Sequence, residues 1–198
     1  MGSLYRFNLP ALQNSLGLAV FIETGTGNGD SLAHAAEAAF DRLFSIEISA
    51  VACKAAQRRF AHDRRIEIIG LDSVGGLTRI LTELAPTVQP ALFWLDAHFP
   101  GAPNLATYDA EPNPDLRWPL ESEIRLIRQM RADRRDVIII DDLRIYIDGP
   151  FGNGNAAPVV RTPTRSLDFI IDCFKDTHNY SIMWEDEGYM MLSPRSDL

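Results

Sequence analysis

Short apolar runs alternate with helix-like stretches along most of the chain. Each run is continuous rather than alternating, which is typical of strands buried on both faces of a parallel sheet. The stretches between them carry alanine or apolar residues at helical spacing. We therefore expect strands at Leu18–Ile22, Leu43–Ile48, Ile66–Ile69, Ala91–Leu95 and Val137–Ile140, and helices at Ser31–Phe40, Ala50–Phe60, Ser73–Leu84 and Leu120–Met130.

The C-terminal part of the chain breaks this rhythm. Ser181–Trp184 and Tyr189–Leu192 are both strand-like, and the four residues between them include Gly188, which predicts a hairpin. Strands that alternate with helices indicate an α/β, Rossmann-like doubly wound fold with a mostly parallel sheet. Together with the antiparallel hairpin, this sheet resembles that of the class I methyltransferases. We expect residues 1–198 to form a single domain.

Two stretches show no regular pattern. Phe99–Trp118 is rich in proline, and Gly149–Pro163 contains three glycines and three prolines. Both follow predicted strand ends that carry carboxylates, so we interpret them as loops on the substrate side. Plain surface loops are the alternative, although long irregular loops in compact domains are usually functional or mobile.

The charge balance excludes some classes of partner. The formal net charge is −8, whereas a general nucleic-acid binder depends on Lys and Arg to neutralise phosphates. We expect the arginine clusters at 58–65 and 125–135 to be solvated helix faces. Cys53 and Cys173 stand far apart, which favours neither a disulfide framework nor a metal site.

Targeting patterns are also lacking in the sequence. No apolar run reaches the ~18–20 residues that a membrane span needs, and the N-terminus does not read as a secretory signal. We therefore expect no membrane partner, and cytoplasmic location is the default.

A glycine-rich turn follows the first predicted strand. The segment Glu23-Thr24-Gly25-Thr26-Gly27-Asn28-Gly29 lets the backbone turn sharply and lie against a ligand. A dinucleotide site would have the spacing G-x-G-x-x-G, and Asp30 stands where its third glycine would fall. This spacing weakens the case for an NAD-linked oxidoreductase.

The same turn resembles motif I of the class I methyltransferases, which is an acidic residue followed by x-G-x-G-x-G. The resemblance implies S-adenosylmethionine as cofactor, held by Gly25, Gly27, Gly29 and, at its methionine end, Glu23. Glu47 ends the second predicted strand, and an acidic residue about 20 positions after the first glycine can bind ribose hydroxyls. The family often contacts adenine where Asp72 and Ser73 stand.

Carboxylates also end the fourth and fifth predicted strands. Asp96 follows one, and Asp141 and Asp142 follow the other. Ligands of open α/β sheets bind outside the carboxyl ends of the strands, so these three anions should lie close together there. A divalent cation such as Mg²⁺ would relieve their repulsion and lower the pKa of a bound hydroxyl.

This carboxylate pattern resembles the metal-dependent sugar O-methyltransferases. The resemblance implies that Asp96, Asp141 and Asp142 bind the metal and that Asp96 takes part in catalysis. His98 stands where those enzymes can carry an acidic general base, and histidine can serve as a base near neutral pH. A polar loop residue or a helix cap is the alternative for His98, and strand-end solvation is the alternative for the aspartates.

A further resemblance covers most of the chain from Leu18 onward. The segments 95–99, 119–124 and 137–142 are similar to a group of bacterial proteins among macrocin O-methyltransferase-like sequences. In the second segment, Glu121 and Glu123 either turn toward the pocket or are first-turn acids favoured by the helix dipole. The interpretation as first-turn acids is the favoured one.

The acceptor pocket is less well defined by the sequence. The sugar enzymes have extra N-terminal and lid segments, whereas about 17 residues precede the first predicted strand here. The two long loops or a second copy of the chain would then complete the pocket. Five aromatic residues are candidates for stacking on an acceptor, although core positions are commoner for such residues: Trp94, Tyr108, Trp118, Tyr146 and Phe151.

Three hypotheses follow. The first is an enzyme that transfers a methyl group from S-adenosylmethionine to a hydroxyl of a sugar or small molecule, with Mg²⁺ assistance. The second is a non-catalytic module that binds a cofactor or partner in a glycan or natural-product pathway. The third is the NAD-linked oxidoreductase.

Overall fold

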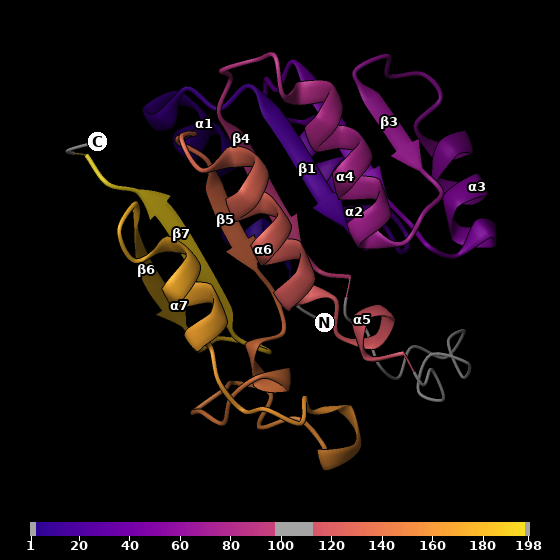
Figure 1. The fold of residues 1–198 in the computed structure, drawn as a ribbon. Helices are drawn as coiled ribbons and strands as arrows, with labels where there is room; N and C mark the ends of the chain where they lie inside the picture. Colours follow the sequence, from indigo (N-terminus) through magenta and orange to yellow (C-terminus); the bar gives the residue numbers. More distant parts are fainter. Residues whose placement is uncertain (1–2, 98–112, 197–198) are drawn as a thin grey trace.

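The chain forms one seven-stranded sheet in a computed structural model that describes residues 3–97 and 113–196 (Figure 1). The strand order is β3-β2-β1-β4-β5-β7-β6, with parallel pairing from β3 to β5. β7 lies antiparallel to both β5 and β6. The strands are Val20–Thr24 (β1), Arg42–Ile46 (β2), Ile66–Ile69 (β3), Ala91–Leu95 (β4), Val137–Ile140 (β5), His178–Met183 (β6) and Tyr189–Pro194 (β7).

Helices cover both faces of the sheet. One apolar core lies between the sheet and α4, α6 and α7, which stand in front of it in Figure 1. A second core lies between the sheet and α1, α2 and α3. The helices are Leu9–Leu16 (α1), Asp30–Ala36 (α2), Ala50–Arg59 (α3), Ser73–Leu84 (α4), Pro114–Arg117 (α5), Leu120–Arg131 (α6) and Asp168–Phe174 (α7), with 3-10 turns at Leu4–Arg6 (η1), Leu143–Ile145 (η2) and Pro158–Val160 (η3).

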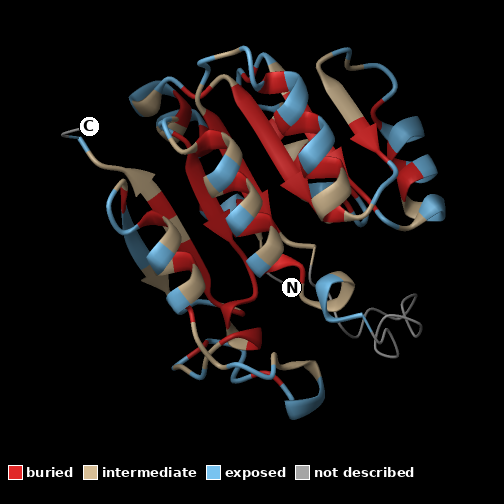
Figure 2. Cartoon of the chain, viewed as in Figure 1, coloured by how far each residue is buried: buried red, intermediate tan, exposed pale blue. Residues whose placement is uncertain are grey.

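The central strands are buried on both faces, as their apolar runs predicted. β1, β4 and β5 are buried at every position, and Figure 2 shows them in the interior of the fold. This burial and the parallel pairing confirm the α/β doubly wound fold with an antiparallel terminal hairpin. None of the described helices is long and apolar enough to cross a membrane.

The bounds of several elements agree with the apolar pattern, whereas those of α2, β2 and β6 differ from the expected ones by up to four residues. β3, β4, β5 and α4 have the expected bounds, whereas β1 begins two residues later than expected and continues through Glu23 and Thr24. α1 and α7 were not expected. α5 lies within the stretch expected to be irregular, and the Asn113 side chain caps its start, as the Asn8 side chain caps the start of α1.

One arginine expected on a solvated helix face is buried instead. Arg131 at the end of α6 is 6% exposed and forms two hydrogen bonds to the Asp136 carboxylate, at 2.6 and 2.7 Å. The same carboxylate accepts a hydrogen bond from the backbone N–H of Ala91, which begins β4. The expectation was wrong here because a buried carboxylate supplies the charge that the arginine needs.

Candidate active site

The glycine turn after β1 needs glycine for two reasons. Gly25, Gly27 and Gly29 all have positive φ, at 85°, 51° and 80°, where side chains are strained. A Cβ at Gly25 would also overlap the backbone carbonyl of Asp96. The turn therefore lies directly against the carboxyl end of β4.

Glu47 closes this turn from the neighbouring strand. Its Oε2 accepts a hydrogen bond from Gly27 N at 2.8 Å, and its Oε1 accepts one from Ser49 N at 2.7 Å. Each carboxylate oxygen has room for a second donor. Glu47 thus lies beside the loop and holds it in shape, and its binding of ribose stays a prediction.

Glu23 lies under the loop with no exposed surface. The Ser45 hydroxyl donates a hydrogen bond to Glu23 Oε2 at 2.5 Å, and the Thr26 hydroxyl lies 2.5 Å from that of Ser45. Glu23 Oε1 has no hydrogen-bond partner. Burial raises the pKa of Glu23 to about 8, although the Ser45 hydrogen bond opposes the shift. A buried acceptor without a donor can receive a hydrogen bond from a bound cationic or hydroxyl group.

Asp72 caps α4 in this structure. Its Oδ1 accepts a hydrogen bond from Gly75 N at 2.8 Å, and Ser73 is buried in the first turn. Two exposed apolar side chains flank this part of the edge: Ile48 is 52% and Leu71 41% exposed. Sequence reasoning missed them because an apolar residue next to a strand end reads as core. Their only signal is that each directly adjoins a polar candidate, Glu47 or Asp72.

The carboxylates after β4 and β5 lie on adjacent strand ends. Asp96 N donates to Thr24 O and Asp141 N donates to Leu95 O, both at 3.1 Å, so the parallel pairing continues just past the strands. Asp141 and Asp142 are buried. The sheet therefore brings the β1 turn and the aspartates to one edge.

These carboxyl groups raise one another's pKa. Burial raises the pKa of Asp96 well above its usual range, and the charges of Asp141, Asp142 and Glu23 add to the effect. Burial and the Asp142 charge do the same for Asp141. Burial raises the pKa of Asp142 to about 7, although the charge of Arg144 opposes this. The edge thus holds carboxyl groups that can take up protons near neutral pH.

The carboxylate oxygens at this edge are the ligands that a hard divalent cation prefers. Asp141 Oδ1, however, already accepts a hydrogen bond from Asp142 N at 2.7 Å, and Arg144 Nε lies 3.6 Å from Asp142 Oδ1. In residues 3–97 and 113–196, no three His, Cys, Asp or Glu side chains form a group that could hold a metal ion. A cation would have to draw the aspartates together.

The two acidic residues in the first turn of α6 differ in their exposure. Glu121 is exposed and pairs with Arg125 at 2.7 Å, as expected of a helix-surface acid. Glu123 is completely buried, and neither of its carboxyl oxygens has a hydrogen bond of good geometry. The hydroxyls of Ser73 and Thr24 lie close enough to lower its pKa, although burial raises that pKa to about 7.

A polar network that was not expected fixes the segment after β5. Glu187, in the hairpin turn, is buried and accepts hydrogen bonds from Arg144 at 3.2 Å and from Asn153 Nδ2 at 3.1 Å. Leu143 N also donates to Gly188 O at 3.1 Å. The hairpin turn therefore holds the loop that carries Asp142.

The described end of the first irregular stretch is hydrogen-bonded to the second stretch. Trp118 Nε1 donates to Val160 O at 3.1 Å, and Arg117 Nη2 donates to Val159 O at 2.7 Å. Of the other aromatic candidates, Trp94, Tyr146 and Phe151 are buried in the core. His98 and Tyr108 lie outside the described residues.

The N-terminal segment packs at the same edge, where N is marked in Figure 1. Phe7 packs edge-on against Trp94 and Tyr189, at ring distances of 6.2 and 5.6 Å. Ser3 N donates to the Tyr189 hydroxyl at 2.8 Å, and Arg6 forms an ion pair with Asp186. Residues 3–7 therefore cover one side of the carboxyl edge.

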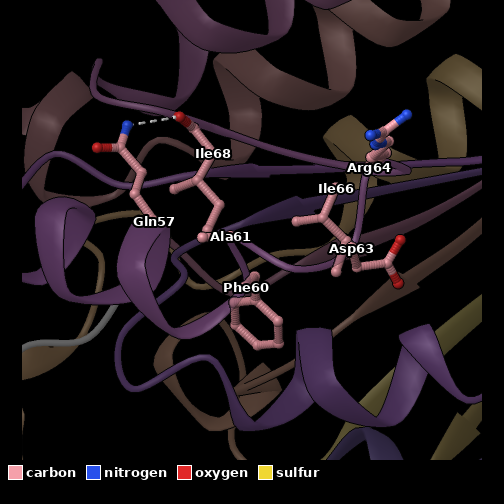
Figure 3. Close-up of a pocket in the computed structure, with 7 residues that line it drawn as sticks. All are labelled: Gln57, Phe60, Ala61, Asp63, Arg64, Ile66 and Ile68. Carbon is pink, nitrogen blue, oxygen red and sulfur yellow. Dashed lines mark hydrogen bonds between the residues drawn. The ribbon is translucent and has the colours of Figure 1, made fainter.

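A cavity of about 220 Å³ lies elsewhere, between α3 and β3 at the outer edge of the sheet (Figure 3). Gln57 Nε2 donates to Ile68 O at 3.0 Å across it. Its lining contains none of the candidate residues above: it consists of Gln57, Phe60, Ala61, Asp63, Arg64, Ile66 and Ile68.

Comparisons with known proteins give matches at the level of structure. No family profile and no curated protein matches the sequence. A Staphylococcus aureus protein assigned as a caffeoyl-CoA O-methyltransferase superposes with a TM-score of 0.59 at 13% identity, over 98% of this chain and 85% of that one. An O-methyltransferase from Bacillus cereus in complex with SAH gives 0.50 at 17%, over 94% and 79%. The 23S rRNA methyltransferase ErmE gives 0.50 at 13%, over 94% and 67%.

The chain has the class I methyltransferase fold. At these identities the likeness concerns the fold alone. This methyltransferase fold places the glycine turn, Glu47 and Asp96 at the carboxyl edge of the sheet, where ligands of open α/β folds bind. The macrocin-like subgroup stays a prediction.

Proposed function

We propose that the chain binds S-adenosylmethionine at the glycine turn and transfers its methyl group to a hydroxyl of a sugar or small molecule. The observation that carries the proposal is the buried Glu23 Oε1, which has no partner and lies beneath a turn that needs glycine. The SAH that accompanies the Bacillus cereus O-methyltransferase supports the choice of cofactor.

The residues around the turn fit the parts of this cofactor. Glu23 Oε1 would accept a hydrogen bond from the ammonium of the methionine end, which would also compensate its burial. Glu47 would accept hydrogen bonds from ribose hydroxyls with its remaining lone pairs. Ile48 and Leu71 would cover the faces of the adenine ring, beside Asp72 and Ser73.

The acceptor would lie at the ends of β4 and β5. When bound, the cofactor supplies a methyl group on a positively charged sulfur. The acceptor hydroxyl would receive this methyl group with loss of its proton, which the Asp96 carboxylate would take up. The raised pKa of Asp96 makes it a stronger base than an exposed aspartate.

The proposal also includes a divalent cation that assists the transfer. Asp96, Asp141 and Asp142 would hold it, and it would supply the positive charge that acidifies the acceptor hydroxyl. The mutual increase of their pKa values supports this part, because a cation would relieve that repulsion.

The fold does not select the acceptor, since ErmE acts on rRNA and the Bacillus cereus protein is an O-methyltransferase. The net charge of −8 favours an acceptor without a polyphosphate backbone.

Calorimetric titration with SAH, with and without Mg²⁺, tests the proposal. We expect micromolar binding that Glu47→Ala abolishes. That variant removes both the hydrogen bond from Gly27 N and the carboxylate that would bind the ribose hydroxyls. Glu37→Ala is the control, since its side chain is 77% exposed on the surface of α2. No binding by the wild-type protein in either buffer would refute the cofactor proposal. Binding that Mg²⁺ does not strengthen would refute only the metal part.

A further inference from the structure

Ser45 places a hydroxyl group where β2 is otherwise apolar. It follows Leu43 and Phe44, precedes Ile46 and has no exposed surface. A buried hydroxyl costs free energy unless it is hydrogen-bonded, so its presence in this strand points to a partner. Ser45 lies opposite Glu23 in the parallel pairing of β1 and β2, and the two side chains therefore share one face of the sheet.

Three side chains form a continuous series of hydrogen bonds at this point, which we name the hydroxyl relay: Thr26, Ser45 and Glu23. The Ser45 hydroxyl donates to Glu23 Oε2 at 2.5 Å, and the hydroxyl oxygens of Thr26 and Ser45 lie 2.5 Å apart. A hydroxyl has one proton to donate, and Ser45 uses its proton toward Glu23, so Thr26 must donate to Ser45. Both protons of the hydroxyl relay therefore point toward the carboxyl group.

Thr26 is itself part of the glycine turn. It stands between Gly25 and Gly27, and it is only 4% exposed. The backbone N–H groups of Gly25 and Thr26 both donate to the Ile46 carbonyl oxygen, at 2.9 and 3.2 Å. The turn is thus joined to β2 by its backbone and by the Thr26 side chain, so its conformation is coupled to the position of Glu23.

The hydroxyl relay also decides which oxygen of Glu23 is left for a ligand. Oε2 is held by Ser45, whereas Oε1 is buried and has no hydrogen-bond partner. Oε1 is therefore the oxygen that can bind either a proton or an N–H group of a ligand. Burial raises the pKa of Glu23, and the Ser45 hydrogen bond opposes this shift, which favours the ionised form that a cationic group needs.

We propose that Ser45 and Thr26 are positioning residues that hold Glu23 Oε1 toward the ammonium of the cofactor, and that they make the site selective for ligands with an amino-acid group. The inference deepens the proposed function and rests on it, because it concerns how the same site recognises one end of S-adenosylmethionine. The side chains of the hydroxyl relay contact Glu23 and one another. Their loss should therefore weaken recognition of the amino-acid end and leave recognition of the adenosine end unchanged.

A pair of ligands separates the recognition of the two ends. SAH carries the amino-acid group, whereas methylthioadenosine has the same adenosine and a thioether without that group. We expect the wild-type protein to bind SAH more tightly. Ser45→Ala should raise the Kd of SAH about tenfold with little change in the Kd of methylthioadenosine, as measured by calorimetry. Ser15→Ala is the matched control, because its exposed hydroxyl on α1 donates only to Leu12 O, at 3.2 Å.

A second pair of variants covers the case in which Ser45→Ala does not fold. Thr26→Val removes the first hydroxyl of the relay and keeps the branched shape, so it should weaken the binding of SAH alone. Thr26→Ser keeps the hydroxyl and should retain the wild-type ratio of the two Kd values.

The outcomes distinguish the hydroxyl relay from the cofactor proposal. If Ser45→Ala and Thr26→Val weaken both ligands equally, or neither, the positioning role is refuted and the cofactor proposal stands. Wild-type binding of SAH that is no tighter than that of methylthioadenosine would refute the positioning role in the same way. If the wild-type protein binds neither ligand, the cofactor proposal falls and this role falls with it.

Discussion

Gly25 and Gly27 are two glycines of one turn that differ in the space around them. Both have positive φ, but a Cβ at Gly25 would meet the Asp96 carbonyl, whereas one at Gly27 would meet nothing within 4 Å. We expect Gly27→Ala to lower the free energy of unfolding by about 1–2 kcal/mol, through backbone strain alone. Gly25→Ala should lower it by about 3 kcal/mol or more, because overlap with a backbone atom adds to the strain.

Urea denaturation of the two variants measures the difference. Gly17→Ala, at the end of α1, is a further control because it has positive φ and open space in a part of the chain away from the site. Equal losses at Gly25 and Gly27 would show that the turn does not press against β4.

The buried Glu23 makes stability depend on pH. Its pKa is about 8 in the folded protein and near 4.5 in the unfolded chain, so the folded state binds the proton more tightly. The stability associated with the neutral form is fully present below pH 4.5 and is lost as the pH rises toward 8. The loss is on the order of 1.4 kcal/mol for each pH unit.

Chemical denaturation at pH 5 and pH 8 tests this dependence. Relative to the wild type, Glu23→Gln should gain stability as the pH rises, whereas Glu37→Gln, on the surface, should not. A constant difference between Glu23→Gln and wild type would mean that Glu23 is not held neutral by the fold.

At the scale of residues, the sequence predicts which side chains reach the edge better than what they contact there. The motif predicts Glu23 and Glu47 as site residues, because they stand at the ends of the first two predicted strands. The bonds of Glu47 to Gly27 N and Ser49 N depend on the shape of the turn, which spacing does not specify. Glu123 was interpreted as a first-turn acid, although Leu120 and Ile127, three residues before it and four after it, share its buried helix face.

The hairpin turn between β6 and β7 is an element that stabilises another loop. Glu187 accepts hydrogen bonds from Arg144 and Asn153, so it joins the segment after β5 to the hairpin. Glu187→Ala should lower the free energy of unfolding by about 1–3 kcal/mol, because Arg144 and Asn153 lose the acceptor that they share. Thermal or urea unfolding measures this, and Glu185→Ala in the same turn is the exposed control. Equal effects of the two variants would contradict the structural role.

Strands that consist entirely of apolar residues were predicted with their bounds, whereas two short helices were not predicted. β4 and β5 have no polar position, so their bounds follow from composition. α1 and α7 have eight and seven residues, and only caps and tertiary packing distinguish such segments from loops. β1 continues through Glu23, whose buried carboxyl group accepts a hydrogen bond from Ser45, and a hydrophobic pattern cannot register such a bond.

The net negative charge of the whole molecule should weaken its binding to polyanions such as RNA. We expect RNA to bind more weakly than about 100 µM at physiological salt, which is below the affinity of general nucleic-acid binders. Fluorescence anisotropy with a labelled single-stranded RNA measures this, and SAH binding in the same preparation serves as the positive control. Tight binding that falls steeply with salt would point to an RNA acceptor instead.

The packing of residues 3–7 has a practical consequence for anyone who prepares the protein. Phe7, Ser3 and Arg6 hold this segment against Tyr189 and Asp186 at the carboxyl edge, whereas β7 runs antiparallel and leads residues 194–196 to the opposite end of the strands (Figure 1). A purification tag ahead of Ser3 would be attached at the carboxyl edge, where the candidate site lies. A tag at the other end of the chain would lie away from that edge and is the better choice for ligand titrations.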